Sequence, residues 1–251
     1  MLSPSPSPAV RRPLLSLDPD LGRLLDPERF AQARAELAVR VVGLGRNWDA
    51  LERAGAAHTG LLVLGGVVGR EIESAGAVAV TELLGPGDLL RPWRPEGETD
   101  LLDITVRWRV LAPATAAVLD RHVGQQLGRW PEIGVVLLDR VSERAHRLAV
   151  TQAISQLTGI ERRLHALLWH LAGRFGRVSA DGIVLPLTLS HRMLGQIVGA
   201  RRPTVSTALG VLAREGRVAR RDDGAWLLLG DPPTLDPGPG HRAAAALASP
   251  A

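Results

Sequence analysis

Two short helical patterns joined by a glycine constrain the fold of this chain more than any other part of its sequence. Ser190 has the side chain of a helix N-cap, and the helix that it opens runs through Val198. Gly199 then allows a tight turn. The next helix has apolar residues at positions i, i+3, i+4 and i+7 of one face: Val205, Ala208, Leu209 and Leu212. This spacing predicts a helix-turn-helix whose second helix keeps its opposite face outward.

The outward face of the second helix is polar, and two arginines stand at its start. Arg201 precedes the face, whose members are Arg202, Pro203, Ser206, Thr207 and Gly210. A helix N-terminus carries partial positive charge, so adjacent guanidinium groups are unfavourable there in an isolated protein. They become favourable when DNA supplies phosphates and the O6 and N7 acceptors of guanine. We therefore predict a nucleic-acid partner. The alternative is a pair of solvated arginines in a chain whose 30 basic residues are all arginine.

The sequence on both sides of these helices completes a winged helix-turn-helix over residues 158–230. A helical pattern covers residues 159–176, and an extended run covers residues 181–187. Residues 216–230 predict a hairpin, because an Asp-Gly pair stands between two apolar runs. The order of helix, strand, helix, turn, helix and hairpin is that of a module whose recognition helix enters the major groove.

Charge and composition indicate which part of the chain could bind nucleic acid and which kinds of chemistry are excluded. Residues 159–230 hold 11 arginines against 5 acidic residues, a net charge of +6, which leaves 4 − 6 = −2 for the rest of the chain. The basic part is the one expected to bind nucleic acid. Zero cysteines exclude disulfides, cysteine nucleophiles and thiolate metal sites. No apolar run approaches the roughly 18 residues of a membrane span, and the first residues lack the order of a signal peptide. We expect a soluble, cytoplasmic protein without a membrane partner.

The first half of the chain predicts an antiparallel β-barrel of the jelly-roll type over residues 28–115. Short apolar runs cut by glycine fill residues 51–112, as in small barrels and sandwiches. Apolar residues that alternate with arginine mark one half-buried strand: Val106, Trp108 and Val110. A helical pattern that starts at Pro27 precedes the strands and ends at Gly43 and Gly45.

Connecting and dimerisation helices are predicted over residues 116–157. A short helical pattern covers residues 114–130, and Pro131 opens a longer one that runs to Leu157. At 1.5 Å per residue this second helix is roughly 40 Å long. Its apolar positions recur every three to six residues: Leu138, Val141, Ala145, Leu148 and Ile154. Such a helix is either the spine of one domain or packs against its twin, and we favour the homodimer. The predicted fold class is α+β.

Both ends of the chain are predicted to be disordered tails. Residues 1–27 are rich in proline and serine with scattered charge, and residues 231–251 are rich in proline, glycine and alanine. Segments of such composition bury too little apolar surface to offset the entropy of ordering.

The order of these parts resembles the Crp/Fnr family of bacterial transcription regulators. In that family a cyclic-nucleotide-binding-type β-barrel is followed by a long dimer helix and a C-terminal winged helix-turn-helix. The resemblance covers residues 30–230, and its most specific part is "LSHRMLGQIVGARRPTVSTALGVLAREGRV", residues 189–218. The run "LLGPGDLLRPW" resembles the barrel turn before the effector site. The implied function is a homodimeric regulator that reads a pseudo-palindromic operator in double-stranded DNA, with RNA polymerase as a candidate partner.

The resemblance assigns roles to residues of the helix-turn-helix. Arg202 matches the family arginine that contacts guanine, and Thr204 matches the residue whose hydroxyl meets the DNA backbone. Pro203 and Thr207 stand where the best-known members have a glutamate that reads cytosine and another basic reader, which implies a different operator. A proline is tolerated in the first turn of a helix, so the binding mode is retained. The candidate DNA-binding residues are Ser190, Arg201, Arg202, Pro203, Thr204, Ser206 and Thr207.

The sensor half departs from the family pattern. Cyclic-nucleotide-binding members bind ribose and phosphate through a Gly-Glu pair and a later Arg-Ser or Arg-Thr pair. Here Arg91-Pro92 and Asp103-Ile104 stand near those positions. Proline removes an amide donor and aspartate would repel a phosphate, so we expect no classical cyclic-AMP binding and name no cofactor. Three arginines could bind another anion or be solvated: Arg91, Arg94 and Arg107.

Two other classes of function are weighed against a regulated DNA-binding protein. A cupin-like barrel enzyme would need two or three histidines and a carboxylate around one metal, but His58 is the only histidine of residues 51–112. We therefore predict that the chain is not an enzyme and holds no metal. Haem sensing would need an axial histidine, and His122 and His146 are as isolated as His58. A DNA-binding factor that responds to no effector remains an open alternative.

Overall fold

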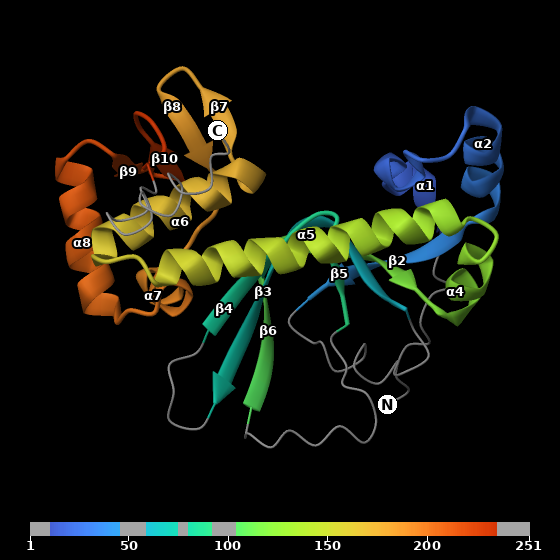
Figure 1. Ribbon diagram of the computed structural model, residues 1–251, viewed down its shortest axis with the longest axis horizontal. Helices are drawn as coiled ribbons and strands as arrows, with labels where there is room; N and C mark the ends of the chain where they lie inside the picture. Colours follow the sequence, from blue (N-terminus) through green and yellow to red (C-terminus); the bar gives the residue numbers. More distant parts are fainter. Residues whose placement is uncertain (1–10, 46–58, 75–79, 92–103, 235–251) are drawn as a thin grey trace, which may run out of the picture. The chain divides into compact units, whose positions relative to one another are not determined.

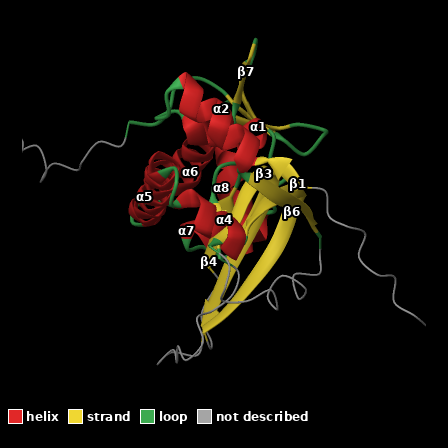
Figure 2. Cartoon of the chain, turned by 90° about the vertical axis from the view of Figure 1, so that its right-hand side faces the viewer, coloured by secondary structure: helices red, strands yellow, loops and turns green. Residues whose placement is uncertain are grey.

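A long antiparallel pair of strands forms the centre of the sheet in the first half of the chain. In the computed structural model, which describes residues 11–45, 59–74, 80–91 and 104–234, β3 (Gly60–Ser74) pairs with β6 (Ile104–Leu119). β2 (Ala38–Leu44) pairs with the other edge of β6, and β1 (Arg11–Pro13) pairs with β2. β4 (Val80–Leu84) and β5 (Leu89–Leu90) both pair with β3. Figures 1 and 2 show β3, β4 and β6 side by side.

The strands confirm an antiparallel β domain, although the described strands form an open sheet. Their order is β1-β2-β6-β3-β4, with β5 beside β3, so among the described residues β1 and β4 stand at opposite ends and do not pair. β3 is irregular where its register with β6 shifts on both sides of Gly65. Gly66 has a φ of 78°, and a Cβ atom there would lie 2.1 Å from the carbonyl oxygen of Pro113. Glycine is therefore required at this bulge.

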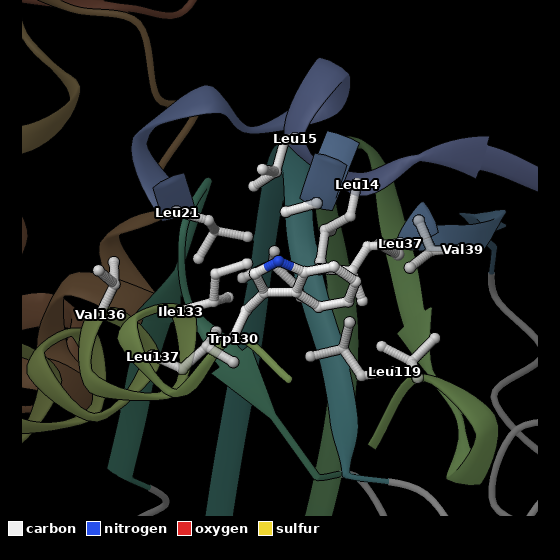
Figure 3. Close-up of a cluster of buried hydrophobic side chains, with 14 residues drawn as sticks. Leu14, Leu15, Leu21, Leu37, Val39, Leu119, Trp130, Ile133, Val136 and Leu137 are labelled. Carbon is white, nitrogen blue, oxygen red and sulfur yellow. The ribbon is translucent and has the colours of Figure 1, made fainter. Parts of the chain in front are cut away.

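Part of the N-terminal segment belongs to the core, which corrects the prediction of disorder for residues 11–27. α1 (Leu14–Leu17), the 3-10 helix η1 (Pro19–Gly22) and α2 (Pro27–Glu36) follow one another, while residues 1–10 lie outside the described residues. Figure 3 shows leucines of this segment around the indole of Trp130. The side chains concerned are no more than 1% exposed: Leu14, Leu15 and Leu21. The prediction relied on the proline and serine content of the segment. It did not take into account that burial of three leucines stabilises the folded segment.

Two stretches that were predicted as helix are strands. α2 ends at Glu36, and residues 38–44 form β2, where the helical pattern from Pro27 was expected to continue. Residues 114–119, expected to start a short helix, are the end of β6. β6 lies between β2 and β3, and its last residues are buried. Pairing on both edges outweighs the helix propensity of its alanines.

Two helices follow the sheet. α4 (Arg121–Leu127) begins after Asp120, whose Oδ1 accepts a hydrogen bond from the backbone N–H of Val123 at 3.0 Å. α5 (Pro131–Ser155) matches the predicted long helix, although it ends at Ser155 instead of Leu157. Of the apolar positions predicted along it, Ile154 is buried and three are exposed: Leu138, Val141 and Leu148. Among the described residues of the first unit, nothing covers the apolar stripe that Leu138, Val141 and Leu148 form on α5.

The chain divides into two compact units between Val150 and Thr151. The second unit has a small antiparallel sheet in the order β7-β8-β10-β9, and it has the predicted winged helix-turn-helix topology. Its elements are α6 (Ile160–Phe175), β7 (Arg177–Ser179), β8 (Gly182–Leu185), α7 (His191–Val198), α8 (Arg202–Arg214), β9 (Val218–Arg220) and β10 (Trp226–Leu228). Together with the sheet of the first unit, this confirms the α+β class. Most of the predicted C-terminal tail, residues 235–251, lies outside the described residues.

The predicted boundaries at residues 28–115, 116–157 and 158–230 stay predictions, because the long helix α5 runs across the division between the two units. Over the described residues, no helix has both the length and the apolar character that crossing a lipid bilayer requires.

Candidate nucleic-acid interface

The turn between α7 and α8 is fixed by one cap and one close backbone approach. Ser190 Oγ accepts a hydrogen bond from the backbone N–H of Met193 at 3.2 Å, as an N-cap does. Gly199 ends α7 with a φ of 68°. The backbone N–H of Ala200 then donates to the carbonyl oxygen of Gly195 at 2.8 Å, and a Cβ atom on Gly195 would lie 2.4 Å from the Ala200 carbonyl oxygen. The start of α8 is therefore held directly against α7.

α8 buries one face and exposes the other, as its periodicity predicts. The apolar positions are no more than 5% exposed: Val205, Ala208, Leu209 and Leu212. The candidate DNA-binding residues of the helix are all exposed: Arg201, Arg202, Pro203, Thr204, Ser206 and Thr207. The structure thus brings six of the seven candidates together on the first two turns of one helix. Ser190, also exposed, caps the neighbouring helix α7.

The positive charge at the start of α8 is uncompensated. Arg201 occupies the N-cap position, and its side chain makes no cap hydrogen bond. Within residues 104–234, neither the Arg201 nor the Arg202 guanidinium forms an ion pair. α8 has no acidic residue in its first turn, and Pro203 lies within that turn. Exposed cations beside the positive end of a helix dipole form a surface that attracts anions.

Two side-chain hydrogen bonds lie behind the arginines. Ser206 Oγ donates to the carbonyl oxygen of Arg202 at 3.1 Å and lies 2.8 Å from Nδ1 of His191. Thr207 Oγ1 donates to the carbonyl oxygen of Pro203 at 3.3 Å. His191 is not among the predicted residues, because nothing in the spacing of residues 191 and 206 reveals that the helix-turn-helix places them together. A polar residue at the first position of α7 was the only available signal.

A second arginine site lies on the wing. The guanidinium of Arg220 stacks over the indole of Trp226 at 4.3 Å from the ring centroid and donates to the carbonyl oxygen of Leu189 at 3.4 Å. At the turn of the hairpin, Asp223 Oδ1 accepts from the backbone N–H of Ala225 at 2.9 Å, and Gly224 has a φ of 80°. The predicted Asp-Gly turn is therefore present, and it holds Arg220 beside the N-terminal end of α7.

Two of the three candidate anion-binding arginines of the first unit lie within the described residues. Arg107 pairs with Glu73 at 2.7 Å, and Arg91 is exposed. Arg94 and His58 lie outside the described residues. So do residues 92–103, most of the run where the family has its phosphate cassette. His122 and His146 are exposed. Over the residues that the structure describes, no three His, Asp or Glu side chains gather as metal ligands would.

The sequence of the second unit matches a known domain family. Residues 162–236 match the Crp-like helix-turn-helix domain. The global nitrogen regulator of Nostoc sp. (strain PCC 7120) is 30% identical over 98 residues, which are 39% of this chain and 44% of that protein. The CRP-like cAMP-activated global transcriptional regulator of Mycobacterium tuberculosis is 29% identical over 156 residues, 59% of this chain and 65% of that protein. The chain therefore spans less than half of the first relative and just under two thirds of the second.

Solved structures share the fold over most of the chain. A cyclic nucleotide-binding domain containing protein from Listeria monocytogenes EGD-e superposes with a TM-score of 0.59 at 15% identity, covering 84% of this chain and 96% of that one. A CRP-family transcriptional regulator from Thermus thermophilus superposes with a TM-score of 0.53 at 20% identity, covering 76% and 89%. At these identities the likeness establishes the fold.

Proposed function

We propose that this chain is a DNA-binding transcriptional regulator of the Crp/Fnr family, and that it places α8 in the major groove. One observation carries the proposal: the exposed guanidinium groups of Arg201 and Arg202 stand at the start of a helix that is anchored on a helix-turn-helix turn, and they form no ion pair among the described residues. In this type of module the N-terminal residues of the second helix contact base edges. DNA supplies the anions that the free protein lacks at this place.

The candidate residues divide into readers of bases and contacts to the backbone. Arg202, on the first turn of α8, is the proposed guanine reader, because a guanidinium can donate two hydrogen bonds to O6 and N7. Arg201 and Thr204 are proposed phosphate contacts, which position the protein without reading sequence. Pro203, Ser206 and Thr207 present small surfaces that let the helix approach the groove closely. Ser190 supports the site through its cap of α7.

A homodimer is the proposed assembly. Leu138, Val141 and Leu148 leave an apolar stripe on α5, and a second copy of α5 is the proposed cover. Two recognition helices related by a two-fold axis would enter successive major grooves about 34 Å apart and read a pseudo-palindromic operator. We further propose that the protein acts in the cytoplasm and not as an enzyme, with RNA polymerase as a candidate partner.

The effector, if the protein uses one, is not proposed to bind through the usual cyclic-nucleotide cassette. The relative from Mycobacterium tuberculosis is named as cAMP-activated. In this chain the run between Arg91 and Ile104 has a proline and an aspartate near the positions where the cassette needs an amide donor and a cation. Titrating DNA affinity with cyclic nucleotides and other metabolites tests this, and a cyclic-AMP-dependent gain in affinity would contradict it.

The experiment that tests the proposed function is selection of bound duplexes from a random pool, followed by affinity measurements. We expect the purified protein to enrich a pseudo-palindrome. Arg202→Ala should lose about 1–3 kcal/mol of binding free energy and relax preference at one base pair of each half-site. Arg201→Ala should weaken selected and random duplexes alike.

Arg214→Ala is the matched control, because Arg214 lies at the last turn of the same helix. It should leave the base preference unchanged. An equal loss on selected and random duplexes for Arg202→Ala would refute the reader role, and no salt-sensitive affinity for any duplex would refute DNA binding altogether.

A further inference from the structure

His191 joins the recognition helix to the wing. It is the first residue of α7, and its half-buried imidazole lies between two elements of the proposed interface. On one side Nδ1 lies 2.8 Å from Ser206 Oγ of α8. On the other side the ring packs against Trp226 of β10, with a centroid separation of 6.4 Å and an interplanar angle of 36°.

The hydrogen bonds of Ser206 determine which nitrogen of His191 carries the proton. A serine hydroxyl has one hydrogen, and in this structure Ser206 uses it to donate to the Arg202 carbonyl oxygen at 3.1 Å. With that hydrogen on the Arg202 carbonyl oxygen, the Ser206 oxygen accepts from His191, and Nδ1 is then the protonated nitrogen of the neutral ring. The lone pair is left on Nε2, which has no hydrogen-bond partner among the described residues.

The charged groups that face His191 are cations. Arg202 approaches from α8 and Arg220 from β9, while Ser206 and Trp226 are the uncharged neighbours. Asp223, a carboxylate of the wing, caps the hairpin turn and acts electrostatically on Arg220. Burial first, and then Arg220 and Arg202, hold the pKa of His191 below its usual range. The ring is therefore neutral at pH 7 to 8 in the free protein.

We propose that docking of α8 on DNA makes His191 take up a proton at Nε2, so that the imidazolium becomes an additional contact to the DNA backbone. The proton comes from solvent and adds to the Nε2 lone pair, and no bond of the protein breaks. Phosphate oxygens near the start of α8 neutralise Arg202 and Arg220 and accept a hydrogen bond from the new N–H. The phosphates thus offset the electrostatic repulsion by Arg220 and Arg202 and add a hydrogen-bond acceptor that favours the imidazolium. This inference rests on the proposed DNA binding.

The consequence is DNA affinity that rises as the pH falls. His191 binds a proton in the complex that it does not bind in the free protein. The association constant therefore increases as the pH falls through the pKa that His191 has in the complex. At constant ionic strength we expect about five- to tenfold tighter binding at pH 6 than at pH 8, since one proton per chain is linked to binding. Because phosphates carry no sequence information, selected and random duplexes should show the same pH dependence.

The test measures duplex affinity by fluorescence anisotropy from pH 6 to pH 8 for the full chain and two variants. His191→Asn keeps an N–H donor for Ser206 but cannot titrate in this range, and its affinity should be independent of pH. His191→Arg carries a permanent charge and should bind at pH 8 about as tightly as the parent binds at pH 6. Calorimetry in two buffers of different ionisation enthalpy should detect proton uptake for the parent alone. Circular dichroism at each pH serves as the control that all three proteins are folded.

The outcomes separate this inference from the proposed function. DNA binding with the same pH dependence in the parent and in His191→Asn would overturn the role of His191 and leave DNA binding intact. A parent protein whose affinity does not change with pH would overturn it as well. Failure of all three proteins to bind any duplex at any pH would overturn the proposed function itself.

Discussion

Gly195 is a residue on which the whole helix-turn-helix depends. Its Cα lies so close to the turn that a Cβ atom would sit 2.4 Å from the carbonyl oxygen of Ala200 and 3.4 Å from Val205 Cγ2. Gly195→Ala should therefore lower the free energy of unfolding by about 1–3 kcal/mol, because the backbone of the turn must move. Chemical denaturation monitored by circular dichroism measures this loss.

Gly210 provides the matched control for Gly195. It lies in the middle of α8 on the exposed face, and a Cβ atom there would meet nothing within 4 Å. Gly210→Ala should raise the free energy of unfolding by about 0.5–1 kcal/mol, because alanine has the higher helix propensity. Equal effects of the two substitutions would contradict the close approach at Gly195.

His165 makes the stability of the second unit depend on pH. Its side chain is 4% exposed, and its Nε2 accepts a hydrogen bond from Trp169 Nε1 at 3.0 Å. Burial and then Arg217 hold the pKa of His165 below the usual 6.5, despite the opposite effect of Glu215. As the pH falls below 6.5, the unfolded chain takes up a proton that the folded chain excludes. The free energy of unfolding should then fall by up to about 1.4 kcal/mol per pH unit.

The measurement is the melting temperature between pH 7.5 and 5.5 for the parent and His165→Gln. The glutamine cannot take up a proton, so the variant should lose less stability on acidification, even though it is less stable than the parent at pH 7.5. Parallel pH profiles for the two proteins would show that His165 does not titrate in this way.

The residues of the candidate interface differ in how far sequence could reveal them. Arg201 and Arg202 follow from helical periodicity, because the buried positions of α8 fix which residues face outward. The partnership of His191 with Ser206 does not follow, since it exists only once the turn at Gly199 folds α8 back beside α7. A local pattern shows which face of a helix is exposed. It does not show which residues of two different helices come into contact.

Among the elements, α5 and β4 are joined by a buried ion pair. Arg144 donates to both carboxylate oxygens of Glu82 at 2.6 and 2.9 Å, and the Glu82 side chain is 8% exposed. Glu82 also pairs with Arg70 of β3 at 2.9 Å. Glu82→Gln should lower the free energy of unfolding by about 3 kcal/mol, because it removes the carboxylate that two partly buried arginines share. Urea denaturation of the full chain measures the loss.

The control for this ion pair is Glu36→Gln at the end of α2. Glu36 pairs with Arg129, but both side chains are well exposed, at 39% and 64%. The same change of carboxylate to amide should therefore alter stability by less than about 0.5 kcal/mol. If the Glu82 and Glu36 variants unfolded at the same urea concentration, the contact between α5 and β4 would contribute little to the stability of the first unit.

The elements that were predicted wrongly are helical by local sequence pattern, but they form strands because they pair with other strands of the sheet. Residues 38–44 continue the apolar positions of α2, so the pattern alone favours a longer helix. Instead, Val39 and its neighbours pair with β1 on one edge and β6 on the other. Residues 114–119 are rich in alanine, yet they lie in the middle of the sheet. By contrast, α5 and α8 have long periodic patterns and were predicted nearly to their ends.

At the scale of the whole molecule, the exposed stripe of α5 predicts the assembly. Leu138 is 65% exposed although it is a large apolar residue on a long helix. Leu138→Glu should convert the proposed homodimer into a monomer, because two carboxylates would face each other across the helix pair. Analytical ultracentrifugation should show about half the molar mass, and affinity for a pseudo-palindromic duplex should fall because one half-site is lost.

Val178→Glu is the corresponding control. Val178 on β7 is 89% exposed, and the substitution makes the same change of chemistry at a site outside the proposed dimer helix. The dimer should persist in this variant. A Leu138 variant that sediments like the parent would exclude α5 as the dimer contact.

The burial of Leu14, Leu15 and Leu21 around Trp130 has a practical meaning for anyone who handles this protein. The proline-rich composition of the first residues suggests starting an expression clone at Pro27. Such a clone would lack the three leucines that pack on the indole, and it would expose an apolar surface to water. Such a shortened protein should bind the dye ANS and precipitate during purification, whereas one begun at Arg11 should keep these three leucines and bind less of the dye.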